Sequence, residues 1–326
     1  MAKVAVLDDW QGVAKSSTDW SALSAIADVI FFERAFQNED DTAAALSDFE
    51  VVLSMRERTP LPASLINRLP NLRMLGITGS SNAVLNLAAC TAKNIVVSNT
   101  TGHGGSEAST AELALGLLLA AARAIPAADA NMRAGYFQED LPVGISLAGK
   151  TIGILGLGRL GSHMARYCQA LNMTVVAWSE NLTVEKARAA GVALVSKEEL
   201  FSTSTAISIH LVLSPRTRGL INASDLARMK PGAILINTSR GPIVNETALV
   251  EAVQARRIIA ALDVYDREPL PQDHPLRSAP NTVLTPHLGY GVQEVWREFY
   301  GQSVENALAF LKGKPVRVVN AEVLRA

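Results

Sequence analysis

Residues 151–179, TIGILGLGRLGSHMARYCQALNMTVVAWS, decide the fold of this chain. The stretch begins with an apolar run, residues 151–155, that ends at a glycine, a pattern typical of a buried strand. Residues 162–170 have the spacing of a helix, and residues 173–178 form a second apolar, β-branched run. Between the first strand and the helix lies Gly-x-Gly-x-x-Gly, at 156–161. This succession predicts a βαβ unit whose first turn is a dinucleotide-binding fingerprint.

Each glycine of that turn is expected to have its own task. Gly156 permits the tight turn, Gly158 lets the backbone approach a pyrophosphate, and Gly161 lets the helix pack closely on the strand. The pyrophosphate would lie at the N–H groups that open the helix, where the helix dipole favours an anion. Arg159 and Leu160, which stand between the glycines, are predicted to lie along the cofactor with them.

Composition limits the class of protein. The chain has 326 residues, of which 48% are hydrophobic, so it can form two domains with separate cores. Its formal net charge of −1 gives no electrostatic reason to expect a nucleic-acid or membrane partner. The longest apolar run, residues 113–122, is too short for a bilayer span, and the N-terminus lacks the pattern of a signal peptide. Cys90 and Cys168 have neither metal-site nor redox spacing. We therefore expect a cytoplasmic protein without a metal site.

Short apolar runs alternate with helical segments along the whole chain, which is typical of parallel, wound α/β sheets. The sequence therefore predicts two α/β domains. The strands expected in the first are residues 3–7, 29–32, 51–54, 73–77 and 95–98. Those expected in the second are residues 151–155, 173–178, 192–194, 206–210, 233–237, 258–263 and 282–285.

Three further segments have a predicted place. Residues 106–123 form a helix pattern that is apolar nearly all round, which indicates a helix buried between two domains. Residues 125–149 lose this periodicity and are interpreted as a helix followed by an extended arm, a candidate subunit contact. Residues 316–319 are expected to return to the first domain as a strand.

Three polar side chains follow predicted strands of the second domain: Arg240, Glu268 and His287. The carboxyl ends of parallel strands meet at one edge of the sheet, where the cofactor is expected. Reduction of a keto acid by hydride needs a cation for the carboxylate and carbonyl, a proton donor, and a group that keeps the donor protonated. Arginine, histidine and glutamate suit these tasks in that order. Taken singly, each has an ordinary structural interpretation, as an ion pair, a surface carboxylate or a satisfied histidine. Their shared edge favours catalysis.

Polar residues also follow two strands of the first domain. Ser80 and Ser81 come after a glycine at one strand end, and Met55 and Arg56 come after another. Ligands of open α/β sheets bind at this edge, so these four residues are predicted to bind the substrate. Arg56 and its neighbour Arg58 have two other interpretations, as solvated surface charges or as partners of a second anionic group.

Five motifs in order resemble those of the D-isomer-specific 2-hydroxyacid dehydrogenases, the family of D-3-phosphoglycerate dehydrogenase, glyoxylate/hydroxypyruvate reductase and formate dehydrogenase. The resemblance covers essentially the whole chain. The motifs are GLGRLGSHMA at 156–165, LVLSPRTRGLIN at 211–222, MKPGAILINTSRGPIVNETAL at 229–249, ALDVYDREPLP at 261–271 and TPHLG at 285–289.

The resemblance implies two Rossmann- or flavodoxin-like domains with parallel sheets. The flavodoxin-like substrate-binding domain would comprise residues 1–102 and 290–326, with an NAD(P)-binding Rossmann domain, residues 103–289, inserted between them. It further implies a homodimer formed through the inserted domain.

Roles for single residues follow from the same resemblance. Arg240 would bind the substrate carboxylate and carbonyl, and His287, partnered by Glu268, would be the general acid/base. The Gly79-Ser80-Ser81 turn resembles the family's cradle for the substrate carboxylate. The residues placed along the cofactor are Thr110, Pro215, Thr217, Thr238, Ser239 and Asp263, the last near either the nicotinamide or the catalytic pair.

Two positions depart from the family pattern. The family's NAD-preferring members usually have an acid at the end of the second Rossmann strand, where this chain has Ser179, followed by Glu180. A serine removes the charge that would repel a 2′-phosphate, but no arginine follows immediately to hold one. We therefore predict use of NAD(P), with a slight lean to NADP. Asn245 stands where the family often has Asp, and it can still cap a helix that begins at Glu246.

The predicted function is hydride transfer between NAD(P)H and a small 2-keto acid, giving the D-2-hydroxy acid. The alternative is an NAD(P)(H)-sensing regulatory or scaffold protein of the same fold, similar to the family's co-repressors, because a fold does not fix a function. Another Rossmann enzyme, such as a methyltransferase, would have no use for the later motifs.

Overall fold

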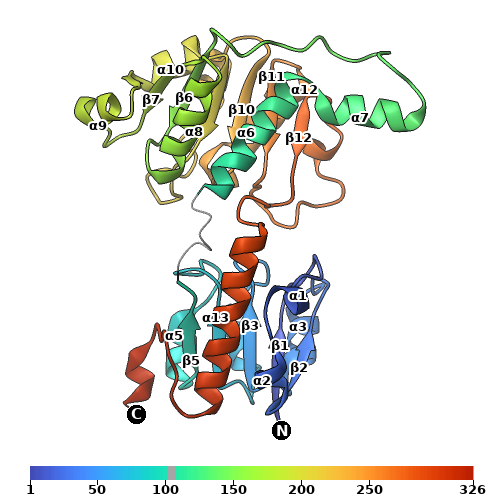
Figure 1. Ribbon diagram of the computed structural model, residues 1–326, viewed down its shortest axis with the longest axis vertical. Helices are drawn as coiled ribbons and strands as arrows, with labels where there is room; N and C mark the ends of the chain where they lie inside the picture. Colours follow the sequence, from blue (N-terminus) through green and yellow to red (C-terminus); the bar gives the residue numbers. More distant parts are fainter. Residues whose placement is uncertain (102–107, 326) are drawn as a thin grey trace. The chain divides into compact units, whose positions relative to one another are not determined.

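The computed structural model describes residues 1–101 and 108–325, and the chain forms two compact α/β units (Figure 1). Unit 1 comprises Met1–Ser106 and Val292–Ala326, and unit 2 comprises Glu107–Gly291. Unit 2 thus interrupts unit 1 in the sequence, as the predicted fold class requires. The expected boundary at residues 102/103 lies outside the described residues, and the expected boundary after residue 289 is close to Gly291.

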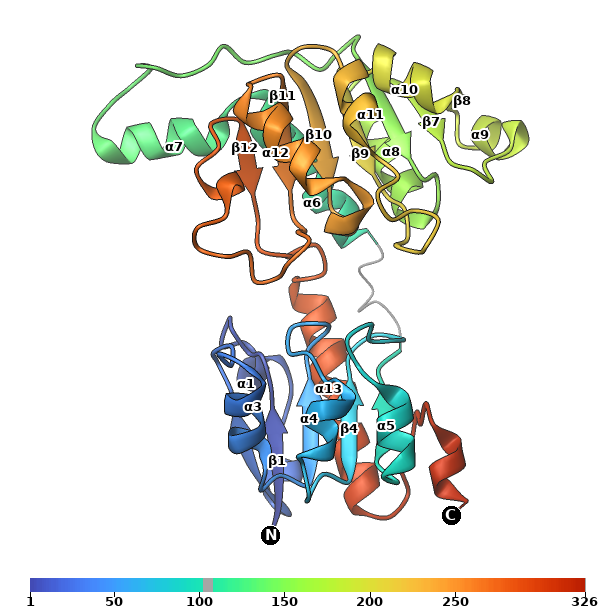
Figure 2. The same ribbon diagram turned by 180° about the vertical axis from the view of Figure 1, so that it is seen from behind.

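The sheet of unit 1 is entirely parallel, with the strand order β2-β1-β3-β4-β5. The long helix α13 covers one face of this sheet in Figure 1, and α4 lies on the opposite face in Figure 2. The strands are β1 Ala2–Val6, β2 Ala27–Phe31, β3 Val51–Ser54, β4 Met74–Ile77 and β5 Val96–Asn99. The helices are α1 Ala14–Ser17, α2 Ser21–Ser24, α3 Glu39–Leu46, α4 Ala63–Asn67, α5 Leu87–Ala92, α13 Gln293–Leu311 and the short 3-10 helix η3 Ala321–Leu324.

The sheet of unit 2 is also parallel, with the order β12-β11-β10-β9-β6-β7-β8. The chain runs outward from β6 in one direction and then returns to β9 on its other side, so the β6/β9 boundary is the topological switch point at which such sheets bind ligands. The strands are β6 Thr151–Leu155, β7 Thr174–Trp178, β8 Ala193–Leu194, β9 Ala206–Ile209, β10 Ala233–Asn237, β11 Ile258–Leu262 and β12 Thr282–Leu284.

Helices cover both faces of this second sheet. In Figure 1, α6 and α8 lie on one face, and in Figure 2, α11 and α12 lie on the other. Leu118 and Met164 pack into the core on the first face, and Leu226 and Leu249 on the second. The helices are α6 Ser109–Ala122, α7 Ile125–Ala134, α8 Arg159–Ala170, α9 Val184–Ala189, α10 Lys197–Thr203, α11 Ala223–Arg228 and α12 Glu246–Gln254, with the 3-10 helices η1 Gly241–Ile243 and η2 Pro275–Arg277.

The predicted fold class is confirmed, and each of the twelve strands predicted for the two sheets forms within a residue or two of its expected bounds. Two expectations need correction. Residues 316–319 make only an isolated antiparallel bridge between Val318 and Ser98 instead of a strand. Helix α6 is buried on one side, whereas Gly116 and Leu119 are exposed on the other, so its apolar sequence overstated its burial.

Helix α7 leads into an extended arm, as expected for residues 125–149. Several apolar side chains of this segment are exposed, among them Met132, Tyr136, Phe137 and Val143. Within the described residues, no single helix is long and apolar enough to cross a membrane; α6 and α7 meet that test only as a pair bent by 62°.

Candidate active site

The glycine-rich turn of unit 2 is built as a phosphate cradle requires. Gly156 has a positive φ of 97°, and a Cβ on it would lie 2.7 Å from the carbonyl oxygen of His210. A Cβ on Gly161 would lie 2.0 Å from the carbonyl oxygen of Gly156, so no larger residue fits there. At Gly158, by contrast, a Cβ would meet nothing within 4 Å among the described residues. The backbone there faces open space at the start of α8, and it fits a dinucleotide pyrophosphate.

The loop after β9 lies against this turn. His210 directly follows that strand, and burial lowers the pKa of its imidazole to about 4, so the ring is neutral at pH 7. The Nε2 atom of His210 lies 2.9 Å from Ser208 Oγ, and its buried Nδ1 has no hydrogen-bond partner among the described residues. Thr217 fixes the next turn, because its hydroxyl donates to the carbonyl of Val212 at 2.7 Å and accepts from the backbone N–H of Ser214 at 2.8 Å.

The end of β7 lies on the other side of the glycine-rich turn. Ser179 is half-buried there, and Glu180 beside it is exposed. The guanidinium Nη1 of Arg216, from the loop after β9, lies 3.8 Å from Glu180 Oε2. The sequence indicated Pro215 and Thr217 at this site but missed Arg216 between them. Its only sequence signal was its place in the Pro-Arg-Thr tripeptide.

Two of the three predicted catalytic side chains meet directly. His287 Nδ1 lies 2.6 Å from Glu268 Oε2, which leaves Nε2 as the ring nitrogen not used in this contact. The other carboxylate oxygen, Oε1, accepts a hydrogen bond from the backbone N–H of Tyr265 at 2.9 Å. The Glu268 carboxylate is therefore held at both oxygens, and its orientation toward the imidazole is fixed.

Asp263 holds the turn that carries His287. Its buried carboxylate accepts hydrogen bonds from Thr285 Oγ1 at 2.6 Å and from the backbone N–H groups of Leu288 and Gly289 at 2.7 and 2.9 Å. The backbone N–H of His287 donates to the carbonyl of Asp263 at 2.8 Å. Burial raises the pKa of the Asp263 carboxyl. The expected contact between Asp263 and the cofactor stays a prediction, since the bonds seen here all lie within the protein.

Arg240 follows β10, and its segment packs against the turn that carries Glu268. Asn237 Nδ2 donates to the carbonyl of Arg240 at 3.0 Å. The next residue, Gly241, touches the peptide after Tyr265 so closely that a Cβ would lie 2.1 Å from the Tyr265 carbonyl carbon. The Tyr265 hydroxyl in turn donates to the carbonyl of Thr285 at 3.0 Å. Three strand ends, those of β10, β11 and β12, are thereby joined in one packed cluster.

The other predicted cofactor residues of unit 2 lie near the same edge of the sheet. Ser239 Oγ donates to the carbonyl of Ile209 at 2.9 Å, and Thr110 Oγ1 donates to the carbonyl of Gly289 at 2.9 Å. The hydroxyl of Thr238 is buried and has no partner among the described residues. Their contacts with a cofactor stay predictions, and the orphaned hydroxyl of Thr238 is the group that a ligand would satisfy.

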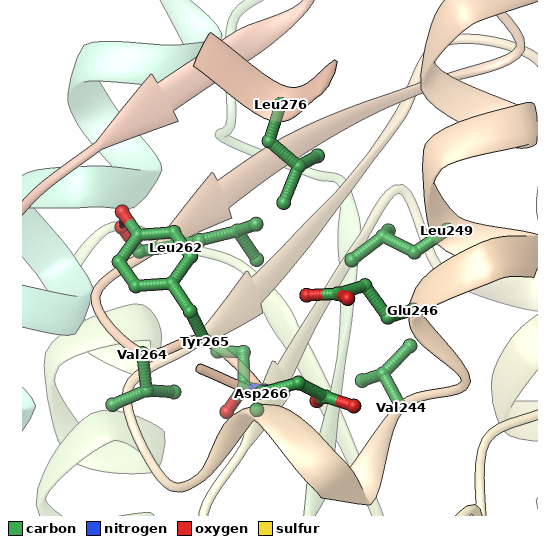
Figure 3. Close-up of a pocket in the computed structure, with 10 residues that line it drawn as sticks. Val244, Glu246, Leu249, Leu262, Val264, Tyr265, Asp266 and Leu276 are labelled. Atoms are coloured by element: carbon green, nitrogen blue, oxygen red, sulfur yellow. Dashed lines mark hydrogen bonds between the residues drawn. The ribbon is translucent and has the colours of Figure 1, made fainter. Parts of the chain in front are cut away.

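A small pocket is lined in part by Tyr265 and Asp266, and its lining contains none of the three predicted catalytic residues (Figure 3). Leu249, Leu262 and Leu276 form its apolar walls. Glu246 and Asp266 also line it, and burial together with the Glu246 charge raises the pKa of the Asp266 carboxyl. This pocket is therefore separate from the contact between His287 and Glu268.

In unit 1, the predicted substrate residues lie at the ends of β3 and β4. The guanidinium of Arg56 packs directly over Gly79, and its Nη1 donates to the carbonyl of Thr78 at 3.1 Å. The backbone φ of Arg56 is 50°. Ser80 and Ser81 are exposed beside it. The predicted role of Met55 needs correction, because its side chain is only 1% exposed and fills the core, which leaves its backbone alone to contact a ligand.

Arg58 is partly buried, so it is not a solvated surface charge, and its contact with a second anionic group stays a prediction. Its guanidinium lies 4.7 Å from the ring centroid of Trp10 and 5.5 Å from that of Trp296, and it donates to the carbonyl of Asp8 at 2.6 Å. The sequence did not indicate this cluster, because its aromatic members come from opposite ends of the chain.

No group of three or more metal-binding side chains is assembled among the residues that the structure describes. Both cysteines are buried free thiols, and burial raises the pKa of Cys90 to about 11 and that of Cys168 to about 12. Neither is a thiolate nucleophile at neutral pH.

The parallel sheet with its switch point, the glycine-rich turn and the polar strand ends define a dinucleotide-binding α/β protein. A family model described as "D-isomer specific 2-hydroxyacid dehydrogenase, NAD binding domain" matches residues 115–289. The chain belongs to the D-isomer specific 2-hydroxyacid dehydrogenase family, and this part of it is an NAD-binding domain. The resemblance inferred from the five motifs is thereby confirmed.

Comparisons with individual proteins support the same family. The chain is 39% identical over 264 residues to a D-3-phosphoglycerate dehydrogenase of Archaeoglobus fulgidus, an alignment that covers 81% of this chain and 50% of that protein. It is 32% identical over 329 residues to a hydroxypyruvate reductase of Blautia hydrogenotrophica, which covers 98% of this chain and 99% of that protein. A solved oxidoreductase from Ralstonia solanacearum is 36% identical and superposes with a TM-score of 0.92 over 99% of this chain and 98% of that one. The chain therefore spans about half of the first relative and nearly all of the other two.

Proposed function

We propose that the protein is an NAD(P)-dependent D-2-hydroxyacid dehydrogenase that reduces a small 2-keto acid, of the glyoxylate or hydroxypyruvate type, to the D-2-hydroxy acid. The observation that carries this proposal is the 2.6 Å contact of His287 with Glu268 at the carboxyl edge of an NAD-binding sheet. A histidine whose Nδ1 is held by a carboxylate is suited to donate a proton from Nε2.

Each side chain has one task in the proposed reaction. The bound dinucleotide supplies a hydride to the keto carbon. His287 gives its proton to the carbonyl oxygen, which becomes the hydroxyl of the product. Glu268 orients the imidazole through the contact of its Oε2 with His287 Nδ1. Arg240 binds the substrate carboxylate and stabilises the charge that develops on the carbonyl oxygen.

The substrate carboxylate is proposed to bind at the ends of β3 and β4, where Arg56 and the exposed turn of Ser80 and Ser81 lie. An arginine fork and backbone N–H groups are suitable partners for a carboxylate.

The exposed side chains of residues 125–149 support a second proposal, that two copies associate through this segment. A homodimer in analytical ultracentrifugation that dissociates on Phe137→Ser would support it.

Turnover measurements test the reaction. Oxidation of NADH or NADPH is followed with glyoxylate, hydroxypyruvate, pyruvate and phenylpyruvate. His287→Ala should lower kcat by about 100-fold or more with little change in KM, because the side chain acts mainly in the transition state. Arg240→Ala should lower kcat and raise KM, because arginine serves both the ground state and the transition state. Wild-type turnover in His287→Ala would overturn the assignment of His287 as the proton donor. If the wild type oxidised neither NADH nor NADPH with any of the four keto acids, the cofactor-sensing alternative would be favoured.

The cofactor preference is proposed to lean slightly to NADP. Ser179 supports this lean because it lacks the carboxylate that would repel a 2′-phosphate at the end of β7. The ratio of kcat/KM for NADPH and NADH measures the preference directly. A hundredfold preference for NADH would contradict the lean.

A further inference from the structure

The ion pair of Arg216 with Glu180 lies where the adenosine ribose of a dinucleotide is expected. In Rossmann domains the residue at the end of the second strand faces the ribose 2′ position. Here that residue is Ser179, and Glu180 follows it. The chain supplies no arginine at the next positions, but the structure brings Arg216 within 3.8 Å of Glu180 from a different element. A cation therefore stands beside the residue that follows Ser179, although it comes from another part of the chain.

The sheet order explains how Arg216 reaches this place. Strand β6 lies between β9 and β7, so the loop after β9 has to pass the glycine-rich turn at the end of β6 to meet the end of β7. The close contact of Gly156 with the carbonyl of His210 marks this passage. The hydrogen bonds of Thr217 to Val212 and Ser214 then fix the loop's tip, where Arg216 stands.

The ion pair of Arg216 with Glu180 is weak enough for another anion to replace Glu180. The side chains of Arg216 and Glu180 are 70% and 66% exposed, and exposed ion pairs contribute little to stability because water screens them. A phosphate monoester has close to two negative charges at pH 7 and three acceptor oxygens that match the planar guanidinium fork. A phosphate placed beside Ser179 would thus compete well with a single, solvated carboxylate.

We propose that Arg216 binds the 2′-phosphate of NADP(H), and that Glu180 is the internal anion that pairs with Arg216 and competes with this phosphate. The specificity-determining cation is then supplied by the loop after β9 rather than by the end of β7. This inference rests on the proposed lean of the protein to NADP, and it supplies a cation for the 2′-phosphate in a chain where an acid follows Ser179.

The test measures binding without turnover. The full-length protein is titrated calorimetrically with adenosine 2′,5′-diphosphate, which has the 2′-phosphate, and with adenosine 5′-diphosphate, which lacks it. Arg216→Ala should weaken binding of the first by about tenfold or more and leave the second unchanged, because one charge-assisted contact is lost. Glu180→Gln should tighten the first severalfold, because the competing anion is removed. The matched control is Arg218→Ala, two residues along the same loop, whose charge acts on Asp266; it should change neither affinity.

Three outcomes would overturn the inference: equal weakening of both ligands by Arg216→Ala, no effect of Arg216→Ala, or loss of the discrimination in Arg159→Ala alone. The titration measures nucleotide binding alone, so its result does not depend on whether the protein reduces a keto acid. A wild type that discriminates the two ligands through Arg216 but reduces no keto acid would retain the inference and remove the proposed function.

Discussion

His287 has a backbone conformation that a residue with a Cβ seldom adopts, with φ of 56°. Such a residue persists only where its surroundings fix it, and the cost is of order 1–3 kcal/mol. Asp263 supplies the fixing bonds, since its carboxylate accepts from the two residues that follow His287 and from Thr285. The backbone geometry of His287 is therefore set by a buried residue one strand away from it.

Replacement of Asp263 by asparagine tests this role at the scale of a single residue. An amide presents a donor where one carboxylate oxygen accepts, so at least one of the three bonds is replaced by a repulsive contact. We expect Asp263→Asn to lower kcat about tenfold or more, because a shifted His287 no longer donates its proton along the right path. Binding of adenosine 5′-diphosphate should be unchanged, because the glycine-rich turn is untouched. A wild-type kcat in this variant would show that the turn does not depend on Asp263.

At the scale of elements, the ends of β10 and β11 are joined by a contact that only glycine permits. Gly241 presses on the peptide between Tyr265 and Asp266, and the same Tyr265 holds Glu268 through its N–H group. A change at the end of β10 is thereby transmitted through backbone contacts to the turn that carries Glu268, the partner of His287.

The substitution Gly241→Ala should displace the turn that carries Glu268. The added methyl group would lie 2.1 Å from the Tyr265 carbonyl carbon, and the obstacle is backbone, which cannot turn aside as a side chain can. Overpacking of this kind costs about 1–3 kcal/mol. We expect a lower free energy of unfolding and a kcat reduced by more than the stability loss explains, measured by urea titration and steady-state kinetics. Full activity in a destabilised variant would separate the contact from catalysis.

Gly116→Ala provides the opposite case in α6. A Cβ at this position meets nothing within 4 Å among the described residues, and the residue lies in the interior of a 14-residue helix. Alanine loses less backbone entropy than glycine on folding, so the variant should gain about 0.5–1 kcal/mol in free energy of unfolding. The same urea titration measures this gain, and kcat should not change. A loss of stability would mean that the exposed side of α6 is in contact with another part of the protein.

For the whole molecule, the sequence predicted those features that depend on runs of neighbouring residues. Apolar runs such as residues 151–155 and 233–237 located the strands, and the glycine spacing located the turn before α8. The order of motifs then placed Glu268 and His287 at one edge, where they meet. The limits come from contacts between distant segments. Nothing near Glu180 indicates Arg216, and nothing near Gly241 indicates Tyr265, because the strand order and not the local pattern brings them together.

Asp8 is another residue whose state depends on the whole fold of unit 1. It follows β1, is fully buried, and its Oδ2 has no hydrogen-bond partner among the described residues. Burial raises the pKa of this carboxyl from 3.8 to about 6, against the smaller lowering effects of Thr59 and Arg58. A raised pKa means that the folded state prefers the protonated acid. The stability that this preference contributes is present below about pH 4 and is lost as the pH rises through about 6.

Asp8→Asn should therefore gain stability over the wild type as the pH rises. Asparagine has nearly the same shape, tolerates the positive φ of 61° found here, and cannot ionise. Its advantage in free energy of unfolding should grow by roughly 1–2 kcal/mol between pH 5 and pH 7.5. The reason is that the folded wild type has a buried negative charge at Asp8 only at the higher pH, whereas asparagine has none at either pH. Urea titrations at both pH values, followed by tryptophan fluorescence, measure the difference, because Trp10, Trp20 and Trp296 all lie in unit 1. An advantage that is equal at the two pH values would show that Asp8 ionises in the folded protein as it does in the unfolded chain.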